Sequence, residues 1–267
     1  MNQIINIFYN KNKKSQSIRE EVQEKLESRG FTISYDNHPD GILNLCIGGD
    51  GAFLRAVHDS NFSPIPFVGI NTGHLGFYQE ILIPHIDRFI DDFIHQNYHV
   101  ESLFTLQAQG IIHGSNQSYR HRALNEFVIK NSDNSIIYID VYVDDNHLET
   151  FAGDALLVST PAGSTAYNFS AGGSILYQQL EGYQLTPLAP INSKAYRSLL
   201  NSLVIPKHAV LKMDVRLRGD HNFLLIADGI THEYPKAKIS FTISETRVKK
   251  LVFNENWYWL NIKDKFL

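Results

Sequence analysis

The chain has 267 residues, of which 43% are hydrophobic and 19% are charged, and its formal net charge is −4. This balance describes a folded protein with a substantial core, in one large or two smaller domains, and excludes a disordered chain. The slight acidity argues against a nucleic-acid-binding face, and a single cysteine excludes an internal disulfide framework and fits a reducing cytosol. No apolar run approaches the ~20 residues of a membrane span, and the first residues lack the basic segment of a signal peptide. We therefore expect a soluble, cytoplasmic protein with neither a nucleic acid nor a membrane as partner.

The first hundred residues alternate between strand and helix patterns. Short apolar runs predict strands at residues 4–9, 31–35, 42–47 and 66–70. Ile18, Val22 and Leu26 recur at every fourth position and predict an amphipathic helix over 16–29, which Ser17–Glu20 would begin with capping-box spacing. Similar patterns predict helices at 52–58 and 84–94. This alternation is typical of an α/β domain with a parallel sheet.

From about Tyr98 onward the sequence predicts strands without helices between them. They fall at residues 101–109, 123–130, 136–144, 155–160, 208–217, 223–227, 238–244 and 249–254. Such a series favours a second, β-rich domain. We therefore predict an α/β domain over 1–98 and a β-rich domain over 99–254. The aromatic tail 255–267 is expected to pack back on the first domain.

The stretch Gly48-Gly49-Asp50-Gly51 joins a predicted buried strand to a predicted helix. Glycines here let the backbone turn sharply and approach a ligand closely. The start of the following helix favours an anion such as a phosphate. Asp50 would repel that anion. This repulsion is understandable if Asp50 takes part in the reaction, as a proton acceptor or through a metal. The alternative is a tight turn in which Asp50 only caps the helix.

Two further stretches carry polar groups at predicted strands. Asn71–Phe77 follows a strand and would face the same crevice as Asp50, although alone it reads as a plain loop. Asn125 and Glu126 interrupt an apolar strand pattern, so at least one of them would point toward a core. They are either a pair that hydrogen-bonds ribose hydroxyls or a bulge or strand end at the surface.

The densest polar stretch is Gly153–Gly173, in which a strand leads into a turn rich in hydroxyl groups, proline and glycine. Hydroxyls and free backbone N–H groups can bind a sugar or phosphates, and Tyr167 offers a ring face to a base. A capped, Ser/Thr-rich loop would account for any three of these residues but not for the whole run. Cys46, by contrast, lies in an apolar strand, as an inert core thiol does.

Together these motifs resemble the NAD kinase family, of the single-subunit type widespread in bacteria. Residues 48–51 correspond to the family's Gly-Gly-Asp-Gly motif, and residues 125–126 to its Asn-Glu pair. Further along, residues 153–154 correspond to its Gly-Asp, 160–167 to its Thr-Pro-Thr-Gly-Ser-Thr-Ala-Tyr and 171–173 to its Ala-Gly-Gly. The chain departs from the family at three positions. Ala162 replaces the usual Thr, Ala52 a common Thr, and Ala152 a residue that is basic in many members.

The resemblance implies phosphorylation of the adenosine ribose 2′-hydroxyl of NAD, giving NADP, with ATP and a divalent metal such as Mg²⁺. Whether polyphosphate also serves as the donor stays open. Asp50 would accept the hydroxyl proton, and Gly48, Gly49 and Gly51 would admit the donor's phosphates. The residues implied to contact NAD are Asp50, Gly51, Arg55, Asn125, Glu126, Asp154, Ala162, Thr165, Ala166, Tyr167, Asn168, Ser170 and Ala189.

The resemblance also implies a homo-oligomer, expected to be a tetramer, in which Asp154 reaches a site of a neighbouring subunit. Two alternatives remain. A lipid or sphingoid-base kinase shares the Gly-Gly-Asp-Gly motif, but it would need an apolar acceptor pocket, which the hydroxyl-rich loop argues against. A non-catalytic NAD(P)-binding sensor would have kept the cleft, and only the three alanine departures support it.

Overall fold

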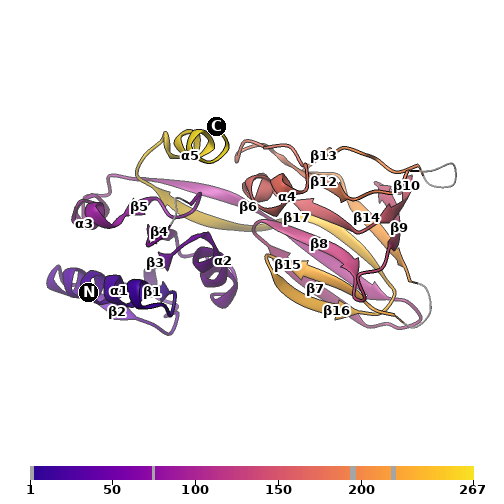
Figure 1. Cartoon of the computed structure of the whole chain (residues 1–267). Coiled ribbons are helices and arrows are strands. Elements are labelled where there is room, and N and C mark those ends of the chain that lie inside the picture. The colour runs from indigo at the N-terminus through magenta and orange to yellow at the C-terminus, as the bar shows by residue number, and fades with distance from the viewer. Residues whose placement is uncertain (1–2, 74–75, 193–196, 218–220) are drawn as a thin grey trace. The chain divides into compact units, whose positions relative to one another are not determined.

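The computed structural model describes residues 3–73, 76–192, 197–217 and 221–267. The chain forms two compact units, one made of Met1–Ser102 with Arg247–Leu267 and the other of Leu103–Thr246 (Figure 1). It passes between the units within two long strands, β6 (His99–Ile112) and β17 (Ala237–Val252). The last segment of the chain is thus part of the same unit as the first hundred residues.

The first unit contains a parallel sheet with the strand order β2-β1-β3-β4. These strands are β1 (Ile4–Tyr9), β2 (Thr32–Ser34), β3 (Gly41–Gly48) and β4 (Phe67–Asn71). On its other edge, β4 pairs in parallel with β5 (Ile81–Leu82) and with the end of β17 at Lys250. The predicted α/β class of this part of the chain is confirmed.

Helices supply the apolar faces that cover this sheet. They are α1 (Lys13–Ser28), α2 (Asp50–Asp59) and α3 (Ile86–Ile94), which follows the 3₁₀ turn η1 (Ile83–His85). The unit also contains the C-terminal helix α5 (Trp257–Phe266). The apolar residues of α1 and α3 share one core with Leu43, Leu45 and Ile47 of β3. The predicted start of α1 at residue 16 was wrong, because Asn12 caps the helix by accepting the Ser15 N–H at 2.9 Å.

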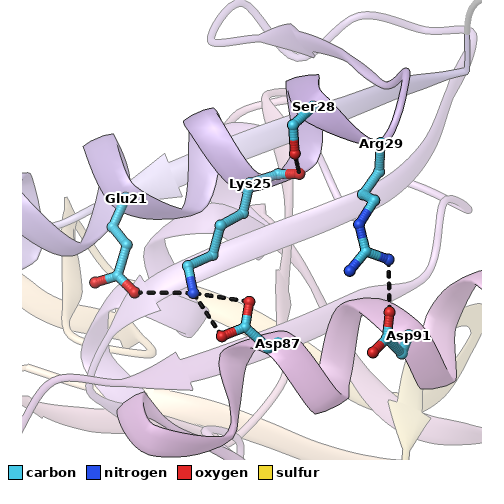
Figure 2. Close-up of polar contacts among 6 residues, drawn as sticks. All are labelled: Glu21, Lys25, Ser28, Arg29, Asp87 and Asp91. Carbon is cyan, nitrogen blue, oxygen red and sulfur yellow. Dashed lines mark hydrogen bonds and ion pairs between the residues drawn. The ribbon is translucent and has the colours of Figure 1, made fainter.

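Charged side chains connect the exposed edges of α1 and α3 (Figure 2). Lys25 lies 2.6 Å from Asp87 and 3.3 Å from Glu21, and Arg29 pairs with Asp91. Exposed ion pairs of this kind each contribute about 0–1 kcal/mol to stability. The apolar core beneath them therefore holds the two helices on the sheet, and the ion pairs only help to align them.

On the opposite face, α2 packs through Phe53. Its ring stacks on Tyr78 at 4.7 Å and lies 5.6 Å from the ring of Phe67. Phe67 points to this face because side chains alternate along a strand and its neighbour Val68 belongs to the other core. Cys46 is fully buried, and burial raises the pKa of its thiol well above the ordinary range, as expected of an inert core residue.

The second unit consists of two sheets packed face to face. One has the order β10-β9-β14-β17-β6-β7, and the other, antiparallel throughout, has the order β13-β12-β11-β8-β15-β16. Buried residues of both sheets, including Phe127, Phe223 and Phe241, form one core between them. The strands not yet given are β7 (Ser118–Ala123), β8 (Glu126–Asn131), β9 (Ile137–Val143), β10 (Asn146–Gly153), β11 (Ala155–Ser159), β12 (Gly182–Leu188), β13 (Leu203–Pro206), β14 (Leu211–Arg216), β15 (Phe223–Ala227) and β16 (Ile230–Tyr234).

The β-rich class predicted for this region is confirmed, but several of its details were wrong. The strand predicted over 123–130 corresponds to β8 and to the last residue of β7, which was otherwise not predicted, and Leu124 and Asn125 separate the two strands. The two strands predicted over 238–244 and 249–254 are one, β17. Strands β10, β12, β13 and β16 were not predicted. Among the helices of the described ranges, none is long and apolar enough to span a membrane.

Candidate active site

The glycine turn lies where β3 ends and α2 begins. A Cβ on Gly48 would fall 2.5 Å from the Cβ of Ala52, so α2 packs directly against a residue without a side chain. At Gly49, the N-cap of α2, a Cβ would meet no described atom within 4 Å, and at Gly51 the first would be Arg55 Nη1 at 3.9 Å. The backbone of these two glycines is therefore open to a ligand, beside the positive end of a helix dipole.

Asp50 is the first residue of α2 and does not cap it, because the N-cap is Gly49. The alternative in which Asp50 is only a cap is thus wrong. Its carboxylate accepts hydrogen bonds from the backbone N–H groups of Phe77 and Tyr78, each at 3.0 Å. Gly76 permits this approach, since a Cβ there would lie 2.3 Å from Asp50 Oδ1.

The segment after β4 also holds the glycine turn in place. The Thr72 N–H donates to the carbonyl of Gly48 at 3.1 Å, and the Gln79 side chain donates to the carbonyl of Gly49 at 2.9 Å. Gln79 is fully buried, and sequence reasoning gave it no role because its partner lies 30 residues away. His74 and Leu75, part of the predicted Asn71–Phe77 stretch, lie outside the described residues.

Arg55 lies one turn along α2 from Gly51, with an exposed side chain. It donates a hydrogen bond to the side chain of Asn10, the residue that follows β1. Arg55 and Tyr35 help to line a cavity of about 180 Å³ at this end of the sheet. The structure therefore keeps a cation beside the glycine turn but fixes it to a neighbouring loop.

In the second unit, Asn125 and Glu126 lie at the junction between β7 and β8. The carboxylate of Asp228 accepts the backbone N–H groups of Leu124 and Asn125 at 2.7 Å each, and that of Glu126 at 3.1 Å. Asp228 occupies the tight turn between β15 and β16 with a φ of 47°. Sequence reasoning missed Asp228, although an Asp-Gly pair between two strands is a strong turn signal.

Glu126 is almost completely buried, with 8% of its surface exposed. Its Oε2 atom has no hydrogen-bond partner within the part of the chain that the structure describes. Burial, reinforced by the negative charge of Asp228, raises the pKa of Glu126 to about 8. At neutral pH this side chain is mainly a neutral carboxylic acid, which can donate as well as accept a hydrogen bond.

The hydroxyl-rich loop docks against Asn125. Thr160 donates its hydroxyl proton to the Leu124 carbonyl at 2.6 Å and accepts the Gly163 N–H at 3.0 Å. Gly163 cannot carry a side chain here, because a Cβ would lie 2.2 Å from the Asn125 carbonyl oxygen. The structure thus brings together two sequence motifs that are more than thirty residues apart.

The residues that follow divide into exposed and buried groups. Thr165 and Ala166 are half-buried, Ser170 is exposed, and the ring of Tyr167 is 45% exposed. Asn168, also predicted to contact NAD, is fully buried instead. Its side chain accepts the Thr186 hydroxyl at 2.6 Å and donates to the Ser164 carbonyl at 3.3 Å. In this structure Asn168 shapes the loop from inside.

Asp154 and Ala189 flank one end of the β11–β12 pair. Both are exposed and stand at the end of the β11–β12 pair where Ala155 faces Leu188. Thr160 follows the other end of β11, five strand residues away, which corresponds to about 16 Å at ~3.3 Å per residue. The loop folds back over this strand pair, because Asn168 bonds to Thr186 and Ala171 packs in the same cluster as Ala155 and Leu188.

Comparison with known proteins identifies the family. The profile of the ATP-NAD kinase N-terminal domain matches residues 38–98, and that of the ATP-NAD kinase C-terminal domain matches residues 124–254. The chain belongs to the NAD kinase family. An NAD kinase of Finegoldia magna is 58% identical, with 99% of this chain and 98% of that protein covered. NAD kinase 1 of Oceanobacillus iheyensis is 33% identical over 95% and 94% of the two chains.

Solved structures share the NAD kinase fold at low sequence identity. The crystal structure of yeast NADH kinase complexed with NADH has a TM-score of 0.86 and 19% identity, covering 99% of this chain and 87% of that one. An NAD kinase from Archaeoglobus fulgidus in complex with ATP has a TM-score of 0.81 and 20% identity, covering 98% of both chains. At this level of sequence identity, both comparisons show a shared fold and nothing further.

The three alanines that depart from the family pattern are all buried. Ala52 and Ala162 are 5% exposed, and Ala152 in β10 is fully buried. The Ala152 carbonyl accepts the Ile191 N–H at 2.7 Å, and its neighbour Gly153 lies so close to Phe151 that a Cβ would fall 2.6 Å from that ring. A long basic side chain at 152 would have to displace this packing, so the alanine fits its surroundings in this member of the NAD kinase family.

Proposed function

We propose that this protein is an NAD kinase that transfers the γ-phosphoryl group of ATP to the 2′-hydroxyl of the adenosine ribose of NAD. The observation that carries the proposal is Asp50. It is a carboxylate anchored by two backbone N–H groups at an open glycine turn, beside the start of a helix. Phosphoryl transfer needs such a site for the donor's phosphates and a carboxylate to orient and deprotonate the attacking hydroxyl.

In the proposed reaction Asp50 takes the proton of the ribose 2′-hydroxyl. The 2′-oxygen forms a bond to the γ-phosphorus while the bond from that phosphorus to the bridging oxygen of ATP breaks, and ADP leaves. The two backbone hydrogen bonds leave further lone pairs on each Asp50 oxygen, so the carboxylate can still accept this proton. Gly49 and Gly51 would give the donor's phosphates access to the N–H groups at the start of α2.

The second unit would bind the adenosine part of NAD. Asn125 and Glu126 are held by Asp228, and the unpartnered Oε2 of Glu126 would gain the hydrogen-bond partner that it lacks. A buried polar group without a partner costs about 1–3 kcal/mol, so a ligand that supplies one binds more tightly. The exposed ring of Tyr167 offers a surface on which a base can stack.

A divalent cation would enter with ATP. Among the described residues, no group of three or more His, Cys, Asp and Glu side chains could hold a metal ion, so the donor set does not fit a cage built from protein alone. Mg²⁺ commonly binds through one or two carboxylates together with substrate phosphates. Asp50 is the carboxylate placed to serve in that way, and the cation would neutralise phosphate charge during transfer.

We further propose that the enzyme is cytoplasmic and works as a homo-oligomer, expected to be a tetramer. Support for the oligomer comes from Asp154 and Ala189, which lie exposed at one end of the β11–β12 pair. Residues so placed would contact NAD bound to a neighbouring subunit. Sedimentation equilibrium of the wild-type protein measures the assembly directly, and a monomer at micromolar concentration would contradict it.

Incubation with NAD, ATP and Mg²⁺ tests the activity, with an NADP-specific dehydrogenase reporting the product. We expect NADP to form from NAD. When a sphingoid base replaces NAD, we expect no phosphorylated base to form. Phosphorylation of the sphingoid base would favour the lipid-kinase alternative. NAD binding without any product, at every concentration of ATP or polyphosphate tried, would favour a sensor instead.

A further inference from the structure

The C-terminal helix α5 places a lysine beside the proposed catalytic carboxylate. Lys265 Nζ lies 3.7 Å from Asp50 Oδ2, within one compact unit. The same ammonium group lies 4.7 Å from the centre of the Phe77 ring, and the Phe77 N–H donates to Asp50. Lys265 and Phe77, both distant from Asp50 in sequence, thus meet at its carboxylate.

Aromatic packing fixes where Lys265 stands. The ring of Phe77 neighbours two aromatic rings of α5, Tyr258 at 6.1 Å and Phe266 at 6.2 Å. These contacts hold the first and last turns of α5 against the segment that bonds to Asp50. The side chains of Lys265 and Asp50 remain 30% and 31% exposed, so both can be reached by a ligand.

A second lysine near this segment, Lys250, is already engaged. Lys250 is 3% exposed, forms an ion pair with Glu101 at 3.9 Å, and donates to the Phe77 carbonyl at 3.5 Å. Its charge is therefore committed inside the unit. Lys265 is exposed enough to turn toward an anion on its flexible four-carbon stem.

Simple geometry relates Lys265 to the group that is transferred. A hydroxyl that gives its proton to Asp50 lies about 2.6–3.2 Å from the carboxylate, and the phosphorus it attacks lies about 3–3.5 Å further on. The transferred phosphoryl group would thus be roughly 6 Å from Asp50, within the swing of a lysine already 3.7 Å from that carboxylate. Negative charge on that phosphoryl group, next to the negative Asp50, needs a nearby cation.

We infer that Lys265 is a donor-binding residue of the reaction. It pairs with Asp50 when ATP is absent and contacts the transferred phosphoryl group when ATP is bound. This inference rests on the proposed function, because it takes Asp50 as the proton acceptor. The competing explanation is that Lys265 only helps to pack α5 against Phe77, in which case its charge has no effect on ATP.

The test compares Lys265→Met, Lys265→Gln and Lys265→Arg in the full chain, with Lys263→Met as the matched control on the exposed side of α5. We expect the Met and Gln variants to lower kcat/KM for ATP by roughly 10- to 100-fold, at or below the roughly 10²–10³-fold cost of removing one preorganised donor, because Lys265 is partly exposed. The Arg variant should recover most of this loss, and the affinity for NAD should stay within twofold of wild type. Lys263→Met should behave as wild type.

Binding of a non-hydrolysable ATP analogue with an imido bridge, measured by calorimetry, keeps the test independent of turnover. The Met and Gln variants should bind it about three- to tenfold more weakly at low salt, and the difference should shrink as salt is raised. Equal analogue affinity in all variants, or an Arg variant as impaired as Met, would overturn the inference. A wild-type protein that binds the analogue with this lysine dependence but makes no NADP would refute the proposed function alone.

Discussion

Glu126 permits a quantitative prediction because its environment changes its ionisation. In the unfolded chain its pKa returns to about 4.5, whereas in the folded protein it is about 8. Between these values the native state holds one proton more than the unfolded state, so its free energy of unfolding falls by about 1.36 kcal/mol per pH unit. Glu126→Gln removes this group but keeps its shape. From pH 5.5 to 7.5, wild type should therefore lose about 2.7 kcal/mol relative to the Gln variant.

Urea unfolding at the two pH values, followed by circular dichroism without NAD, measures this difference. Glu245→Gln is the matched control, because it removes one exposed carboxylate from the same unit. If wild type and Glu126→Gln lost the same stability to within about 0.5 kcal/mol, Glu126 would be ionised throughout this range. The account of Glu126 as a neutral hydrogen-bond donor to NAD would then fail.

Three further substitutions test the site. Asp50→Asn should lower kcat roughly 10²–10⁴-fold in the NADP assay, because an amide cannot take up the proton. It should also lower the free energy of unfolding in urea by about 1–2 kcal/mol, because the amide nitrogen replaces one of two acceptors of backbone N–H groups. A kcat within about tenfold of wild type would contradict a role as base. Gly163→Ala should destabilise the protein by about 1–3 kcal/mol and weaken NAD binding in calorimetry, because the new Cβ meets the Asn125 carbonyl. Unchanged NAD affinity would separate that turn from the ligand. Ala162→Thr should tighten NAD binding by on the order of 1 kcal/mol if the restored hydroxyl reaches NAD, and no change would show that the cleft has re-formed around alanine.

Much of the first unit could be predicted because its strands are simple in sequence. A strand buried on both faces of a parallel sheet reads as a continuous apolar run, as Ile42–Ile47 does. β12 could not be found in this way, since Gln184 and Thr186 interrupt its apolar pattern. Both are buried, and their side chains bond to the Ser174 carbonyl and to Asn168. Polar residues with such distant partners conceal a core strand from sequence reasoning.

The candidate site also contains residues that the sequence could single out and contacts that it could not. The sequence singled out Asp50 and Glu126 because each is an acidic residue in a setting that disfavours it. It could not indicate what holds them, because the partners come from distant turns and a terminal helix. Asp228 lies about a hundred residues from Glu126, and Lys265 more than two hundred from Asp50. Local patterns carry no information on such pairings, and they indicated the break between β7 and β8 only as the strand-end alternative for Asn125 and Glu126.

The alanine departures bear on whether this member of the family has kept a working site. If the site had decayed into a sensor, the lost side chains should leave gaps or unpaired groups around Asp50 and the hydroxyl-rich loop. Instead Ala52 packs against Gly48, Ala152 lies in a closed part of β10, and Thr160 keeps both of its hydrogen bonds beside Ala162. Among the described residues that shape the site, unpaired buried atoms are Gln79 Oε1, on the residue that bonds to the Gly49 carbonyl, and, in the second unit, Oε2 of Glu126, which matches the family motif. The unpaired oxygen of Glu126 costs stability, and a ligand that bonds to it would relieve that cost. Its presence favours a site that is still used to bind NAD.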